Sequence, residues 1–292
     1  MSSANELPVV WIQGAGCSGC SVSVLNGVAP DIASVVLDEL VPGQHLSLRF
    51  HPTVMAGAGE LAVEVLGGLP EEKSSYVLVV EGAIPTGADG AFCEIGQRPD
   101  GEGLLFSEQV HKLAEGARAV VALGDCAAFG GIPSVSPNPT GCMGTKAFLE
   151  TRGVNVPVLN VGGCPPHPDW FLGTLVQFIM SGGLRAGALD PWGRSNLFYG
   201  KLIHDSCPRR ADFDTGRFAK RPGDPGCLYL LGCKGPMTYA DCPDRMWNNG
   251  VTWCIGAGAP CMGCAEARFF ERFGPVYKKI TDDWLERFRD EE

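Results

Sequence analysis

The chain has 292 residues, of which 45% are hydrophobic and 19% are charged, and its net charge is −10. This apolar content excludes a disordered chain, and the negative charge argues against a protein that binds nucleic acid. No apolar run reaches the roughly 18 to 20 residues of a membrane-spanning helix, so we expect no transmembrane anchor. The length allows two domains of ordinary size.

The first part of the chain alternates apolar runs with segments of helical periodicity. The apolar runs cover residues 8–13, 46–50, 75–82, 118–124 and 156–162. The helical segments cover residues 20–26, 57–67, 105–116, 143–152 and 166–180. Such alternation predicts a doubly wound parallel α/β sheet whose strands are buried on both faces. We place this first domain at residues 1–185.

Residues 186–292 form the second predicted domain, and their composition differs. Gly, Pro, Cys and aromatic residues dominate from 190 to 264, and few periodic segments remain. A region with so thin an apolar core needs another source of stability, which bound metal can supply. The last twelve residues, 281–292, predict a short amphipathic helix.

The loop after the first strand carries two competing signals. Residues 14–19 match G-x-G-x-x-G, and Asp38 follows at about the distance of the ribose-binding acid in dinucleotide-binding folds. Cys17 and Cys20 lie in the same loop, where a phosphate would sit. The loop alone therefore leaves a nucleotide and a metal both open.

Two further cysteines favour the metal. Cys126, in "GDCAAFGG", and Cys164, in "GGCPPHPDW", also follow apolar strands within Gly-rich loops. Because such loops gather at the carboxyl edge of a parallel sheet, we expect all four thiols to converge there. Amides at helix N-termini would favour an anionic thiolate cluster. Because a nucleotide gives no reason for Cys126 and Cys164 at equivalent loops, these loops favour an iron–sulfur cluster.

The second half supplies eight more donors, which divide into two sites of four. The simplest grouping joins His204, Cys207, Cys227 and Cys233, and then Cys242, Cys254, Cys261 and Cys264. Spacing alone does not separate zinc from iron–sulfur here, because Cys₃His and Cys₄ zinc sites are common. Three such sites in one chain favour a row of electron-transfer clusters. The alternative is a nucleotide-binding α/β protein with structural zinc sites.

Ten stretches, in order from residue 16 to 264, resemble the small subunit of nickel–iron hydrogenases. They are "GCSGCSVSVL", "FHPTVMA", "VVEGAIPTG", "GDCAAFGGIP", "NPTG", "GGCPPHPDW", "HDSCPR", "GCKGP", "WNNGVTWC" and "PCMGC". The resemblance implies a flavodoxin-like first domain followed by an irregular cysteine-rich iron–sulfur domain. It covers nearly the whole chain, so no single motif carries it.

The resemblance also implies three 4Fe–4S clusters. The proximal cluster would take Cys17, Cys20, Cys126 and Cys164; the distal cluster His204, Cys207, Cys227 and Cys233; the medial cluster Cys242, Cys254, Cys261 and Cys264. Many relatives have proline at the position of Cys254 and a three-iron medial cluster. The cysteine found here is similar to the nickel–iron–selenium branch. Only Cys93 and Cys142 then remain, as buried or free thiols.

The implied function is electron transfer within a heterodimeric hydrogenase. A large subunit would hold the nickel–iron site, so we expect no catalytic residue in this chain. Electrons would pass to an external carrier such as a multihaem cytochrome c. We expect a periplasmic location, with the leader absent from this chain, and keep the cytoplasm as the alternative.

Three polar residues near the first-domain loops have simpler interpretations. We expect Asp125 to be a solvated or capping acid and His167 to cap the start of a helix. Glu81 ends a strand, where it is either a satisfied loop carboxylate or faces an interface.

Overall fold

The structure is a computed structural model that describes residues 5–69, 76–98, 100–183, 185, 187–267, 269–273 and 277–281. It divides into two compact units, Met1–Ser195 and Asn196–Glu292. The sequence placed a domain boundary at 185/186. The helix predicted at the C-terminus falls almost entirely on residues 282–292, which lie outside the described residues.

The first unit is built on a six-stranded sheet with the order β10-β8-β4-β1-β3-β2. Its strands are β1 (Asn5–Gln13), β2 (Glu39–Val41), β3 (Gln44–Phe50), β4 (Val77–Glu81), β8 (Ala119–Leu123) and β10 (Val158–Val161). Five pair in parallel, and β2 joins β3 antiparallel at the edge. The five parallel strands follow the order 2-1-3-4-5 of a flavodoxin-like fold. The predicted fold class and all five predicted strands are confirmed.

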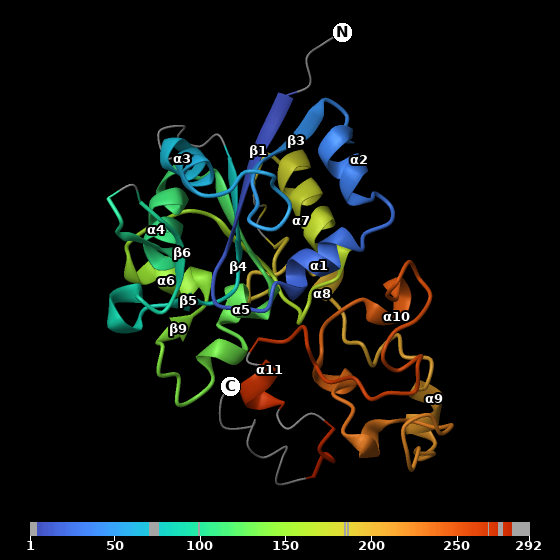
Figure 1. Ribbon diagram of the computed structural model, residues 1–292. Helices are drawn as coiled ribbons and strands as arrows, with labels where there is room; N and C mark the ends of the chain where they lie inside the picture. The colour runs from blue at the N-terminus through green and yellow to red at the C-terminus, as the bar shows by residue number, and fades with distance from the viewer. Residues whose placement is uncertain are drawn as a thin grey trace. The chain divides into compact units, whose positions relative to one another are not determined.

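Helices cover both faces of this sheet (Figure 1). One face carries α3 (Glu60–Gly68), α4 (Phe106–Gly116) and α6 (Thr145–Thr151), and the other carries α1 (Gly19–Leu25), α2 (Ile32–Leu37) and α7 (Pro168–Met180). The sequence predicted five of these six helices. It missed α2, which has only six residues and begins where Asp31 accepts a hydrogen bond from the Ser34 amide at 2.7 Å.

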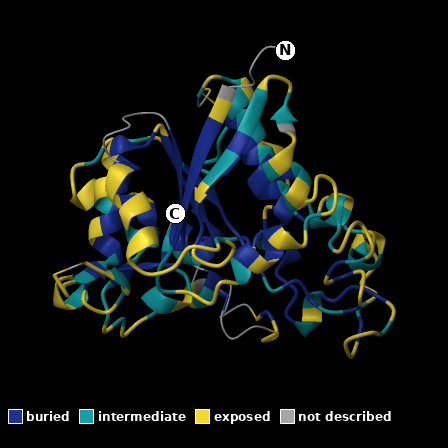
Figure 2. Cartoon of the chain, turned by 45° about the horizontal axis from the view of Figure 1, so that its top comes forward, coloured by how far each residue is buried: buried dark blue, intermediate teal, exposed yellow. Residues whose placement is uncertain are grey.

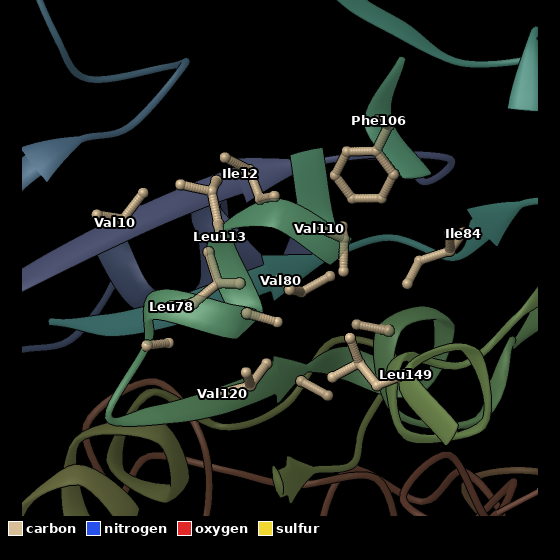
Figure 3. Packing of buried hydrophobic residues seen from close by; sticks show 14 of the residues in the cluster. Val10, Ile12, Leu78, Val80, Ile84, Phe106, Val110, Leu113, Val120 and Leu149 are labelled. Carbon is tan, nitrogen blue, oxygen red and sulfur yellow. The ribbon is translucent and has the colours of Figure 1, made fainter. Parts of the chain in front are cut away.

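The core of the first unit lies between the sheet and the helices α3, α4 and α6. Every residue of β4 and β8 is buried, as expected for strands covered on both faces (Figure 2). Leu78 and Val80 of β4 point toward Val110 and Leu113 of α4 (Figure 3). This packing holds the strand ends, and the loops after them, in fixed positions.

The first unit also contains short elements outside the six-stranded sheet. They are β5 (Ile84–Pro85) paired with β9 (Cys142–Met143), β6 (Glu94–Gln97) paired with β7 (Gly103–Leu105), α5 (Gly124–Phe129), and the 3₁₀ turns η2 (Gly87–Gly90) and η3 (Ile132–Ser134). The sequence did not predict these elements, because each is shorter than two turns of helix or one ordinary strand.

The second unit has little regular structure. Its helices are α8 (Asn196–Tyr199), α9 (Arg210–Asp214), α10 (Cys242–Arg245) and α11 (Phe269–Arg272), with the 3₁₀ turns η4 (Tyr229–Leu231) and η5 (Gly235–Met237). Its described residues form isolated β-bridges rather than strands. Across the described parts of both units, no helix is long and apolar enough to cross a membrane.

Candidate metal centres

The four cysteines of the predicted proximal site lie at the carboxyl ends of three parallel strands. Cys17 lies in the loop between β1 and α1, and Cys20 lies in the first turn of α1. Cys126 lies in α5 directly after β8, and Cys164 follows β10. Sheet topology therefore brings together thiols that are up to 147 positions apart in the chain.

The electrostatics of these thiols reflect their proximity. Burial is the main reason that the pKa of Cys20 is raised, and the Glu81 carboxylate, Cys126 and Cys164 raise it further. Burial likewise raises the pKa of Cys126 to about 12, and Cys164 and Cys17 both add to this. The raised pKa values of Cys20, Cys126 and Cys164 favour the protonated thiols, and iron would have to displace these protons on binding.

Two glycines make room for the sulfurs. A Cβ atom on Gly124 would lie 2.3 Å from the Cys20 Sγ, and one on Gly131 would lie 2.8 Å from the Cys126 Sγ. Both glycines also have positive φ, +84° and +53°, which disfavours any other residue. The Gly-rich loops after β8 therefore form a cradle for thiolates, which the sequence indicated only by its glycine content.

Glu81, at the end of β4, is buried beside this site. Its carboxylate accepts hydrogen bonds from Trp11 Nε1 at 2.8 Å and Gln13 Nε2 at 3.0 Å. It also accepts from the Ser21 amide at 3.0 Å and the Ser21 hydroxyl at 2.5 Å. Of the two interpretations of Glu81, the structure fits the carboxylate whose hydrogen bonds are made within the chain. These bonds hold Ser21, the residue next to Cys20.

Asp125 ties two of the cysteine loops together. Its Oδ1 accepts from the Gly163 amide at 2.6 Å, and its own amide donates to the Gly163 carbonyl at 3.0 Å. The expectation of a solvated or capping acid is wrong, because Asp125 is 3% exposed and bonds a loop 38 positions away. His167 does cap α7, accepting from the Asp169 amide at 3.1 Å, as predicted.

The four donors of the predicted distal site line one pocket of the second unit. Its lining comprises His204, Cys207, Arg209, Cys227, Leu228, Tyr229, Cys233, Gly235, Pro236 and Ile255. Three thiols and one imidazole from a stretch of 30 residues thus face a common space.

Backbone amides point at the sulfurs of this pocket. Burial raises the pKa of Cys233 to about 11, while hydrogen bonds from the Gly235 and Cys261 amides oppose the shift. The Cys261 amide lies 3.4 Å from the Cys233 Sγ. A Tyr229 amide similarly opposes the burial that raises the pKa of Cys227. Such N–H···S bonds stabilise anionic sulfur, as iron–sulfur sites require.

The predicted medial donors also lie near one another. Burial raises the pKa of Cys261 far above its usual value, and Cys233 of the predicted distal site, Cys264 and Cys242 raise it further. Burial raises the pKa of Cys242 to about 12, and Cys254 adds to it, while a hydrogen bond from the Trp247 side chain opposes the shift. The Trp247 indole therefore bonds a sulfur of this site.

The two remaining thiols, Cys93 and Cys142, lie near each other in the first unit. Burial raises the pKa of Cys93, and Cys142 raises it further.

Among the described residues, no three His, Cys, Asp or Glu side chains are gathered closely enough to hold one metal ion.

Two family profiles match the chain. Residues 17–178 match the family described as "NADH ubiquinone oxidoreductase, 20 Kd subunit". Residues 199–277 match the C-terminal family of the "NiFe/NiFeSe hydrogenase small subunit". The first match falls on the flavodoxin-like unit and the second on the cysteine-rich unit.

Individual proteins are similar over nearly the whole chain. The periplasmic NiFeSe hydrogenase small subunit of Desulfomicrobium baculatum is 42% identical, over 94% of this chain and 88% of the relative. The quinone-reactive Ni/Fe-hydrogenase small chain of Wolinella succinogenes is 37% identical, over 96% and 76%. The solved NiFeSe hydrogenase of Desulfovibrio vulgaris Hildenborough superposes with a TM-score of 0.87 at 43% identity, covering 94% of this chain and 98% of that one.

Proposed function

Because this chain belongs to the nickel–iron hydrogenase small subunits, a family that carries iron–sulfur clusters, we propose that it is the electron-transfer subunit of a heterodimeric hydrogenase. The reaction is the reversible oxidation of hydrogen to two protons and two electrons. The observation that carries the proposal is the convergence of cysteines 17, 20, 126 and 164 at one edge of the sheet. Bound there and in the second unit, three 4Fe–4S clusters would supply sites that accept and release single electrons.

The residues of each site fit this role. The first unit would hold the proximal cluster with its four strand-end cysteines. The second would hold the distal cluster with His204, Cys207, Cys227 and Cys233, and the medial cluster with Cys242, Cys254, Cys261 and Cys264. The chain's own contribution is thiolate and imidazole donors, amides aimed at sulfur, and burial that limits access of water. These are the features that set cluster potentials.

The partners follow from what this chain does not supply. We assign the nickel–iron site to a large subunit, since the twelve donors here are committed to clusters. We assign electron exit to the His204 end, because this imidazole is partly exposed and tolerates solvation better than a thiolate. A multihaem cytochrome c is our candidate carrier. Relatives named as periplasmic support a periplasmic location, which cell fractionation would separate from a cytoplasmic one.

The second candidate function is a nucleotide-binding protein with structural zinc. The loop "GAGCSG" favours it, but its glycines serve the sulfurs equally well. The likeness to hydrogenase small subunits over 94% and 96% of this chain argues against it.

Metal analysis of the chain, co-produced with its large subunit, tests the proposal. We expect about 12 iron and about 12 labile sulfide per chain, as three 4Fe–4S clusters require. Changing Cys17 to Ser should lower both numbers, whereas changing Cys93, which has no assigned ligand role, to Ser should leave them unchanged. Stoichiometric zinc with little iron would overturn the proposal.

A further inference from the structure

Lys234 lies between the donors of the medial and distal sites. It follows the distal donor Cys233 directly, and its amide donates to the carbonyl of the medial donor Cys261 at 2.7 Å. The Cys261 amide in turn points at the Cys233 Sγ at 3.4 Å. One buried lysine is therefore tied by backbone to one donor of each site.

The side chain of Lys234 is in the interior, since the residue has 0% exposure. Its Nζ donates to the Gly232 carbonyl at 3.0 Å and the Lys278 carbonyl at 3.4 Å. Carbonyls only accept, so these partners suit an ammonium group, which only donates. The side chain is thus enclosed within the second unit, in a residue that follows one donor of the distal site and bonds the backbone of a donor of the medial site.

A buried lysine is rare unless its charge is compensated, and here the compensation would come from the clusters. A 4Fe–4S cluster with thiolate ligands is an anion, and reduction adds one electron without removing that charge. A cation nearby stabilises the reduced form more than the oxidised form, and the low dielectric of the interior strengthens the effect.

We propose that the Lys234 ammonium raises the reduction potential of the medial cluster and also that of the distal cluster. This inference rests on the proposed function, because it assigns a role toward those two clusters. The electron that reduces either cluster comes from hydrogen oxidised in the large subunit. Because one charge acts on both clusters, it favours electron uptake by the pair while changing the step between them less.

The test is a redox titration of the purified heterodimer, monitored by electron paramagnetic resonance. Lys234→Met removes the charge and keeps the length of the stem, and Lys234→Gln removes the charge but keeps an N–H donor. Lys234→Arg keeps the charge. Lys220→Met is the matched control, because Lys220 is an exposed lysine of the same unit.

We expect the medial and distal potentials both to fall in the Met and Gln variants, with the proximal potential unchanged. The Arg and Lys220→Met variants should leave all three in place. If the medial and distal clusters are retained but neither potential moves, or if only one moves, the shared role is wrong. Loss of these clusters from the Met and Gln variants but not from Arg would also support a charge role, whereas loss from all three would assign Lys234 to packing and overturn the proposal.

The test separates this inference from the function on which it depends. Iron and sulfide content of the unmodified heterodimer decides whether the three clusters exist. The potentials of the Lys234 variants decide only whether this lysine acts on two of them.

Discussion

Replacing Gly124 with alanine tests the proximal site most sharply. Gly124 follows β8 with φ +84°, and an added Cβ would lie 2.3 Å from the Cys20 Sγ. Real Cβ atoms do not approach closer than 3.0 Å, so the sulfur must move by at least 0.7 Å. Metal–ligand distances tolerate only about 0.2 Å.

Gly153→Ala is the matched control for the cost of placing alanine at a positive φ. Gly153 has φ +70° and is exposed, and nothing lies within 4 Å of its added Cβ. Both substitutions place alanine in the left-handed region, at a cost of about 1 to 2 kcal/mol. Only Gly124→Ala also displaces a proposed ligand. The difference between the two variants therefore isolates the contact with Cys20.

Iron and sulfide analysis with electron paramagnetic resonance gives the result. In Gly124→Ala we expect iron to fall from about 12 to about 8 per chain, with the proximal signal lost and the other two signals retained. Gly153→Ala should keep all of its iron. Full iron in Gly124→Ala, or equal loss in both variants, would refute this account of the cradle.

Three further variants test other sites. Cys254→Pro should convert only the medial cluster to a three-iron form, which gives a distinct resonance spectrum; an unchanged spectrum would mean that Cys254 is not a ligand. Glu81→Gln places an amide donor among groups that already donate, so stability should fall by about 1 to 3 kcal/mol, seen as a lower melting temperature, while the exposed Glu150→Gln should change little. Joint replacement of Cys93 and Cys142 by Ser should leave the iron content intact; lost iron would assign them a cluster role.

The sequence predicted most of the first unit because its signals are local. Apolar runs such as 118–124 reveal buried strands without any knowledge of their neighbours. The parallel-sheet rule then places Cys126 and Cys164 at one edge. Hydrogen bonds between distant loops leave no such signal. The bond from Gly163 to Asp125 spans 38 positions, and composition alone favours a solvated aspartate there.

The second unit was predicted less well, for a physical reason. Its eight candidate donors could be read from residue type and spacing, but its path could not, because the longest helix described there has five residues and its described part forms no strand. Helices this short are unstable alone, and turns such as η5, which follows the buried Lys234, depend on tertiary contacts. In such a region, residue patterns predict the metal-binding donors but not the secondary structure.

The lack of long helices and strands in the second unit predicts how the two units respond to loss of metal. The first unit has a continuous core between its sheet and α4, whereas the second joins short elements around donors that lie between residues 204 and 264. Where a fold is organised around bound metal, the free energy of metal binding is part of the free energy of folding. Stripping iron with a chelator should therefore make residues beyond 196 sensitive to limited proteolysis while the sheet unit resists. If both units were cleaved at the same rate, or neither, the clusters would not be what holds the second unit together.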